Sequence, residues 1–115
     1  MKEQINVGVI GLGNRGMSLM TNCILPQPGV TVTAVCDSYR DRADAAAKAV
    51  QEYGSGLPFT TTDYRQVLAR PEIDAVVVTA AWEAHIDMAC AAMQAGKYVA
   101  MEVGGAYSLD DCWRL

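Results

Sequence analysis

The sequence has few of the residues on which metal or hydrolytic chemistry usually depends. Its 115 residues include one histidine, four cysteines and no C-x-x-C pair, so the ligand spacing typical of zinc sites is absent. A Ser-His-Asp unit could be built only on His85, and no G-x-S-x-G motif accompanies it. We therefore predict no metal site, and we expect reduced, mostly buried cysteines.

Excess positive charge and long apolar runs are missing as well. The formal net charge of -4 argues against a surface for nucleic acid or for an anionic membrane. The N-terminus has no basic segment followed by an apolar one, and Glu83, His85 and Asp87 interrupt the apolar stretch between residues 73 and 101. We expect a cytoplasmic protein with neither nucleic-acid nor membrane partners.

What the sequence does contain is a regular alternation of short apolar segments with helical patterns. Strands are expected at residues 5–10, 30–37, 57–60, 73–79 and 97–101. Helices are expected at residues 14–25, 40–53, 64–69 and 82–95 and from residue 108 onward. The nearly unbroken apolar strands are typical of a parallel sheet that is covered on both faces. We predict one Rossmann-like, doubly wound α/β domain over residues 1–115, with strand order 3-2-1-4-5 and helices on both faces.

The motif with the clearest chemistry lies between the first expected strand and the first expected helix. It reads G-L-G-N-R-G and consists of Gly11, Leu12, Gly13, Asn14, Arg15 and Gly16. In such a motif the first glycine permits a tight turn, the second lets the backbone approach a pyrophosphate, and the third lets the helix pack on the strand. Free N–H groups at the helix start favour phosphate, so an acidic protein can bind a dinucleotide here. Arg15 could add a phosphate contact or stay solvated.

A carboxylate stands at the position where dinucleotide-binding domains hold the adenosine ribose. Asp37 ends the second expected strand, 21 residues after Gly16, and it can accept hydrogen bonds from ribose hydroxyls. Its charge repels a 2′-phosphate, which favours NAD over NADP, whereas Arg40 and Arg42 leave the use of NADP open. Two alternatives are a turn residue without a ligand and a methyltransferase that binds S-adenosylmethionine with a similar layout.

A segment near the C-terminus gives these features a family context. Residues 85–102 read H-I-D-M-A-C-A-A-M-Q-A-G-K-Y-V-A-M-E. With the glycine loop and Asp37, they resemble the N-terminal half of Gfo/Idh/MocA family oxidoreductases, whose stretch H-x-x-x-A-x-x-A-L-x-A-G-K-H-V-x-x-E-K-P they match at His85, Gly96 and Glu102 among other positions. The resemblance implies a second α/β domain for substrate contacts and oligomerisation, so we expect this chain to be the cofactor-binding part and self-association to occur.

The resemblance also implies further cofactor contacts and reveals two departures, at Ala80 and at Val103. Thr79 and Ala80 occupy the place of the family's T-P-P or T-P-N, and Glu102 can bond the nicotinamide ribose as the family's glutamate does. His85 is either a residue at the edge of the cofactor or a structural one. The family's lysine, which is usually assigned a catalytic role, is replaced here by Val103. The catalytic residues are therefore unknown, and we expect the remaining ones to lie beyond Leu115.

Three functions stay open at this point. The first is hydride transfer between NAD and a hydroxyl carbon of a sugar, inositol or similar polyol, as the family resemblance implies. The second is redox-neutral glycoside hydrolysis, because E-V followed by small residues and C-W-x-L resembles NAD-dependent glycosidases similar to α-N-acetylgalactosaminidase. The third is a non-catalytic NAD-binding module. We favour the first, with a small carbohydrate-like substrate, and we expect the 115 residues to bind NAD without turnover.

Overall fold

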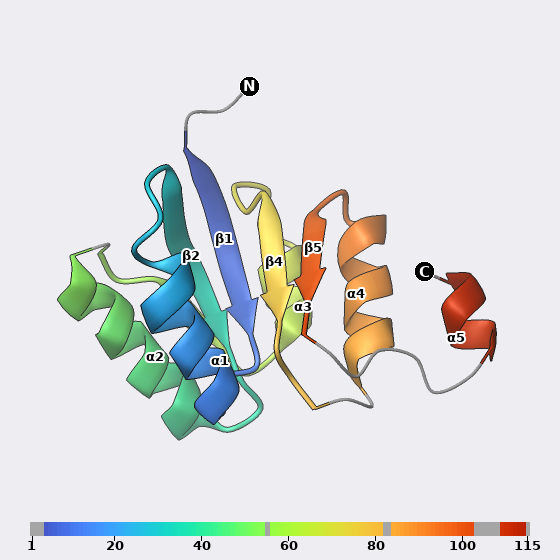
Figure 1. Ribbon diagram of the computed structural model, residues 1–115, viewed down its shortest axis with the longest axis horizontal. Helices are drawn as coiled ribbons and strands as arrows, with labels where there is room; N and C mark the ends of the chain where they lie inside the picture. Colours follow the sequence, from blue (N-terminus) through green and yellow to red (C-terminus); the bar gives the residue numbers. More distant parts are fainter. Residues whose placement is uncertain (1–3, 55, 82–83, 103–108, 115) are drawn as a thin grey trace.

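A five-stranded parallel sheet forms the centre of the molecule. The computed structural model describes residues 4–54, 56–81, 84–102 and 109–114, the side chains of residues 111 and 112 excepted. The strands are β1 (Ile5–Ile10), β2 (Val30–Cys36), β3 (Phe59–Thr61), β4 (Ala75–Val78) and β5 (Tyr98–Met101). They pair in the order β3-β2-β1-β4-β5, and every pair is parallel; in Figure 1 the labelled arrows of β1, β2, β4 and β5 point the same way. The predicted fold class and strand order are confirmed.

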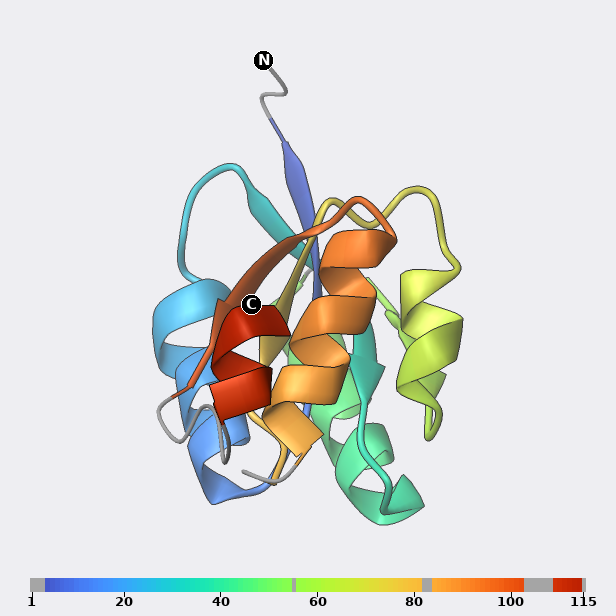
Figure 2. The same ribbon diagram turned by 90° about the vertical axis from the view of Figure 1, so that its right-hand side faces the viewer.

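Helices cover both faces of this sheet. They are α1 (Asn14–Leu19), the π-helical η1 (Met20–Ile24), α2 (Arg40–Tyr53), α3 (Tyr64–Leu68), α4 (His85–Gln94) and α5 (Leu109–Arg114). The side chains of α1, η1 and α2 pack on one face, and those of α3 and α4 pack on the other. Figure 2 views the sheet nearly edge-on, with α1 on one side and α3 on the other. Within the described ranges, no helix is long and apolar enough to cross a membrane.

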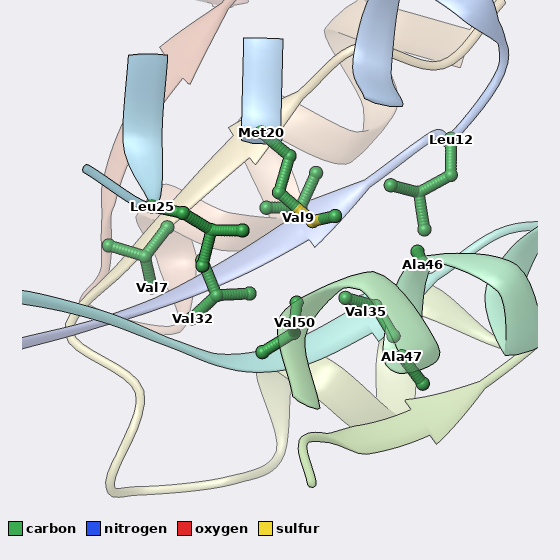
Figure 3. Packing of buried hydrophobic residues seen from close by; sticks show 10 residues of the cluster. All are labelled: Val7, Val9, Leu12, Met20, Leu25, Val32, Val35, Ala46, Ala47 and Val50. Atoms are coloured by element: carbon green, nitrogen blue, oxygen red, sulfur yellow. The ribbon is translucent and has the colours of Figure 1, made fainter. Parts of the chain in front are cut away.

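The core between the sheet and the first two helices is built from small and branched side chains (Figure 3). Met20 and Leu25 lie over the β1 residues Val7 and Val9 and over Val32 of β2. On α2, the buried residues are Ala43, Ala46, Ala47 and Val50. Their spacing of i, i+3, i+4 and i+7 places them on one helical face. This packing fixes α2 beside β2, and therefore fixes the loop that follows β2.

Local signals set the ends of several helices as expected. Gly54 and Gly96 follow α2 and α4 with φ angles of 99° and 81°, a left-handed conformation that glycine adopts without strain. Asp63 caps α3, because its Oδ1 accepts a hydrogen bond from the Arg65 N–H at 3.0 Å. These stops keep the connections short, and the parallel pairing of the strands places their carboxyl ends at one edge.

Lys97 is buried at the opposite edge, just before β5. Its side chain is 7% exposed, and its Nζ donates hydrogen bonds to the carbonyls of Arg70 at 2.9 Å and Ile73 at 2.8 Å. Both carbonyls belong to the connection between α3 and β4. The ammonium group thus replaces water for two backbone acceptors, which makes Lys97 a structural residue at the end of the sheet remote from the glycine loop.

Candidate dinucleotide-binding site

A cleft of about 480 Å³ opens at the carboxyl edge of the sheet, where the chain leaves β1 for α1. The neighbours of β1 are β2 and β4, and their following helices lie on opposite faces, so the cleft sits at the topological switch point. Every cofactor-binding residue predicted from the sequence lines it: Gly11, Leu12, Gly13, Asn14, Arg15, Gly16, Asp37, Thr79, Ala80, His85 and Glu102. The structure thus brings together residues that are 91 positions apart in the chain (102 − 11).

Two glycines of the loop are required by the fold itself. Gly11 has a φ angle of 97°, and a Cβ placed there would overlap the backbone of Thr79 and Ala80. A Cβ on Gly16 would overlap the carbonyl group of Gly11, at a separation that real Cβ atoms do not show. The close approach of β1, β4 and α1 therefore leaves no room for a side chain at either position.

Gly13 is different, because no described part of the chain excludes a side chain there. Its φ angle of -69° suits any residue, and a Cβ at this position would meet only the Arg42 guanidinium, at 3.8 Å. The absent side chain instead keeps the cleft open where α1 begins. A bound pyrophosphate needs that space and the N–H groups beside it, so the residues present fit a dinucleotide.

Hydrogen bonds hold the glycine loop from both neighbouring strands. On the β2 side, the Leu12 N–H donates to Asp37 Oδ2 at 2.6 Å, and the Gly11 N–H donates to the Cys36 carbonyl at 2.8 Å. On the β4 side, the Thr79 hydroxyl donates to the Gly11 carbonyl at 2.5 Å. The loop is therefore preorganised before any ligand arrives.

Asp37 forms backbone contacts on both sides of the end of β2 and also lines the cleft. Its Oδ1 accepts a hydrogen bond from the Tyr39 N–H at 2.8 Å, so the residue does form a turn after β2. With Oδ2 on the Leu12 N–H it also orders the loop, and it still lines the cleft although it is only 7% exposed. Each carboxylate oxygen has a second lone pair that can accept a ribose hydroxyl.

Arg15 and Glu102 meet across the cleft. The Nε of Arg15 donates to Oε2 of Glu102 at 2.7 Å, which links the start of α1 to the residue after β5. The side chain of Arg15 is 66% exposed, so the pair contributes little to stability. The ion pair instead fixes the position of the Glu102 carboxylate, near the end of the cleft opposite Asp37.

The sequence reasoning missed several residues on the β2 side of the cleft. Ser38, Tyr39, Thr62 and Tyr64 line it together with Arg42, which the sequence analysis noted only for the use of NADP. The Arg42 guanidinium lies over the Tyr39 ring at 4.7 Å, whereas Arg40 pairs with Asp44 at 3.1 Å on the exposed face of α2. Of the two arginines noted after Asp37, Arg42 is therefore the one at the cleft.

Of the remaining predicted positions, the structure describes His85 but not Val103. His85 is buried at the start of α4, with its Nε2 2.7 Å from the Ala80 carbonyl oxygen. Val103, the position of the family's lysine, lies outside the described residues, as do residues 82 and 108, where two of the expected helices begin.

Cys36 lies at the floor of the cleft as a protonated thiol. Burial, followed by the negative charges of Asp37 and Asp63, raises its pKa from 9.0 to about 12. In the unfolded chain the thiol ionises near pH 9. The protonated thiol of the folded protein therefore makes its full contribution to the free energy of unfolding below pH 9, and this contribution is lost as the pH rises from 9 to 12.

We expect Cys36→Ala to flatten the alkaline fall in stability. Between pH 9 and 12, the free energy of unfolding of the variant should decrease less steeply, by about 1.4 kcal/mol per pH unit. Urea unfolding at pH 8, 9.5 and 11 measures this difference. Cys23→Ala, which removes an exposed thiol, is the matched control and should follow the wild type. Parallel curves for all three proteins would show that Cys36 ionises alike when folded and unfolded.

The parallel order β3-β2-β1-β4-β5, the glycine loop at the switch point and the acidic residue after β2 define a dinucleotide-binding Rossmann domain. The particular family follows from a comparison with family models. The chain belongs to the Gfo/Idh/MocA oxidoreductases, described as an oxidoreductase family with an NAD-binding Rossmann fold, whose model matches residues 5–115. NAD is thus the cofactor type of this family's domain.

Among curated proteins, the chain is similar to members of glycosyl hydrolase family 109. It is 43% identical over 118 residues to such a protein from Streptomyces niveus and 38% identical over 117 residues to one from Saccharopolyspora erythraea. These matches cover 99% and 98% of this chain but 24% and 25% of the relatives. The chain thus spans about a quarter of the length of the relatives it matches.

Solved structures with the same fold include an inositol dehydrogenase and a 3-ketoreductase. The chain is 30% identical to myo-inositol dehydrogenase from Lactobacillus casei in complex with NAD(H) and myo-inositol, with a TM-score of 0.80, and covers 32% of that chain. It is 26% identical to a 3-ketoreductase from Actinomadura kijaniata in complex with TDP-benzene and NADP, also with a TM-score of 0.80, and covers 33% of that chain. The matches cover 96% of this chain in both cases.

Proposed function

We propose that this chain binds NAD along the cleft, with the adenosine at the Asp37 end, the pyrophosphate at the glycine loop and the nicotinamide at the end near Thr79 and Glu102. The observation that carries this proposal is the open space at Gly13. The fold requires glycine at Gly11 and Gly16, whereas Gly13 leaves open space beside the backbone at the start of α1, where a pyrophosphate can approach. A pyrophosphate is the ligand that the adjacent N–H groups and the start of α1 favour.

The residues of this chain then bind and orient the cofactor. Asp37 would accept a hydrogen bond from an adenosine ribose hydroxyl, and Glu102 would do the same for the nicotinamide ribose. When bound, NAD supplies reversible hydride transfer. We assign no catalytic residue, because Val103 replaces the family's lysine and cannot carry a proton.

NAD is the preferred form in this proposal. The Asp37 carboxylate is held within the cleft by two backbone N–H groups, and a 2′-phosphate on the neighbouring ribose would be repelled by its charge. Arg42 acts in the opposite direction, since its guanidinium lines the same end of the cleft. We expect NADP to bind more weakly than NAD, and Arg42 to keep the difference moderate.

For the whole protein we propose oxidation or reduction at a hydroxyl carbon of a sugar, inositol or similar polyol. The likeness to an inositol dehydrogenase and to a 3-ketoreductase supports this reaction class. The 43% identity to a family 109 glycosyl hydrolase favours a second candidate, in which transient oxidation of a sugar hydroxyl permits elimination and water addition at the glycosidic bond. Both candidates need NAD at the same position.

One experiment separates these two candidates. The full-length protein is incubated with free inositols and sugars and with aryl glycosides of N-acetylhexosamines, and NADH absorbance and released aglycone are followed together. Net NADH with a free polyol supports the dehydrogenase. Aglycone release without net NADH supports the glycosidase and would overturn our first choice.

Self-association and a cytoplasmic location stay predictions.

We expect Gly13→Ala to weaken NAD binding strongly while leaving the domain folded. The methyl group enters open space, so the free energy of unfolding should fall only by the small loss expected at a helix N-cap, about 0.5–1 kcal/mol. It would occupy the space of the pyrophosphate, and affinity should fall by about 100-fold, roughly the loss of two charge-assisted hydrogen bonds. Calorimetric titration gives the affinity and urea unfolding the stability. Unchanged affinity would place the pyrophosphate elsewhere.

A further inference from the structure

Two carboxylates and two guanidinium groups are among the described side chains that line the cleft. Asp37 and Arg42 line it on the β2 side of the glycine loop, whereas Glu102 lines it after β5 and is paired with Arg15. Since the carboxylate after β2 marks the adenosine end, the Arg15–Glu102 pair lies toward the nicotinamide end. The charges of this pair therefore act mainly on the nicotinamide half of a bound dinucleotide.

The two members of this pair differ in their exposure to solvent. The side chain of Glu102 is 23% exposed and that of Arg15 is 66% exposed. Water and salt screen the charge of an exposed group more strongly than that of a partly buried one. Because Arg15 Nε lies only 2.7 Å from Glu102 Oε2, the two charges also offset each other within the cleft. The field of the pair inside the cleft is therefore negative on balance, and Arg15 limits its strength.

The oxidised and reduced forms of NAD present different charges to this end of the cleft. The oxidised nicotinamide ring carries a positive charge, and the reduced ring, which has gained a hydride (one proton and two electrons), carries none. The adenine, the riboses and the pyrophosphate are the same in both forms. A negative field near the ring therefore favours the oxidised form, whereas hydrogen bonds to the riboses and the pyrophosphate hold both forms alike.

We propose that the Arg15–Glu102 pair sets the relative affinity of the domain for oxidised and reduced NAD, with Glu102 favouring the oxidised form and Arg15 limiting this preference. The inference rests on the proposed NAD site. Tighter binding of the oxidised form lowers the potential of the bound couple, by about 30 mV for each tenfold preference in a two-electron couple. A domain with this preference selects the form that a reaction starting with the oxidation of a hydroxyl group needs.

Two substitutions change the charge at this position in opposite directions. Arg15→Gln removes the positive charge and should raise the ratio of the dissociation constants, NADH over NAD, by about threefold to tenfold. Glu102→Gln removes the negative charge and should lower this ratio by a similar factor, while its amide oxygen can still accept a ribose hydroxyl. A lost contact to a phosphate or to a ribose changes both dissociation constants alike, so it cancels in the ratio.

A second arginine–carboxylate pair provides the matched controls. Arg40 and Asp44 pair at 3.1 Å on the exposed face of α2, and neither residue lines the cleft. Arg40→Gln and Asp44→Asn therefore make the same changes in net charge away from the ligand. Both control variants should keep the wild-type ratio.

The test is calorimetric titration of NAD and of NADH into the 115-residue chain and the four variants. Displacement of bound NADH by NAD, followed by NADH fluorescence, gives the ratio a second time, and urea unfolding shows that each variant is folded. If Glu102→Gln does not fold, Arg15→Gln still decides the question, because it changes a mostly exposed side chain.

The possible outcomes separate this inference from the proposed NAD site. A wild-type ratio in both Arg15→Gln and Glu102→Gln would overturn the inference and leave the site in place. Shifts in the same direction in these two variants would show a distortion of the cleft, and equal shifts in the controls would assign the effect to net charge; either result contradicts the role of the pair. If the wild type binds neither NAD nor NADH, the proposed site itself fails.

Discussion

Alanine at Gly16 is expected to lower the free energy of unfolding by about 3 kcal/mol or more and to abolish dinucleotide binding. The new Cβ would overlap the Gly11 carbonyl and crowd the Thr79 hydroxyl that donates to it. Relief requires α1 to move away from β1 and β4, and this movement breaks the loop geometry on which the phosphate site depends. Urea unfolding followed by circular dichroism gives the stability, and calorimetry with NAD gives the affinity.

Gly13→Ala is the matched control for this substitution, because it adds the same methyl group to the same loop without a clash. The two variants should differ in which property they lose. Gly16→Ala loses stability and binding together, and Gly13→Ala loses mainly binding. A Gly16→Ala protein with wild-type stability would mean that α1 can shift without cost and that the packing described for the loop is wrong.

Removing the ammonium group of Lys97 should be the second most damaging change. In Lys97→Met the side chain keeps its approximate length, but the Ile73 carbonyl loses its buried donor and, among the described donors, the Arg70 carbonyl keeps only the bond from the Ile73 N–H. We expect a loss of about 2–4 kcal/mol in the free energy of unfolding, since unsatisfied buried acceptors retain their desolvation cost. Lys97 lies at the amino end of β5, so the folded fraction should bind NAD with unchanged affinity.

Lys48→Met is the control for the loss of positive charge. Lys48 is an exposed residue of α2, and its pair with Glu52 has a separation of 4.0 Å, so its replacement should change the stability little. Equal stability losses in the two variants would show that net charge, and not the two carbonyl contacts, determines the effect. A loss of NAD affinity confined to Lys97→Met would contradict the structural role assigned to this residue.

The strand order could be predicted from the sequence because alternating apolar segments and helical patterns leave few allowed topologies. The limits of the first strand, residues 5–10, were also predicted correctly, but those of the third and fourth strands were not. Leu57 was placed in the third strand, but it is 71% exposed, and pairing with β2 begins only where Phe59 lies opposite Ala34. Ile73 was placed in the fourth strand, yet its N–H donates to the Arg70 carbonyl in a turn. Where a strand begins and ends depends on where its neighbour offers hydrogen-bonding partners. The local sequence pattern carries no information about that neighbour.

The glycine loop, Asp37 and Glu102 were predictable as candidate contacts because the motif and the family resemblance fix their positions. The contacts that these residues make with one another could not be predicted. Arg15 and Glu102 are 87 residues apart in the chain (102 − 15), and only the fold brings them together. The bond from the Leu12 N–H to Asp37 likewise depends on the pairing of β1 with β2. That Nδ1 of His85 is buried with no partner among the described residues is a property of its surroundings, which no spacing rule contains.

The central claim is that this cleft binds NAD, and calorimetric titration of the wild-type chain tests it most directly. NAD, NADH, NADP and ADP are titrated separately, and thermal unfolding is followed with each ligand. The account predicts binding of NAD with one-to-one stoichiometry, weaker binding of NADP because of Asp37, and a rise in the unfolding temperature with NAD. No heat and no thermal shift with any of the dinucleotides would contradict it.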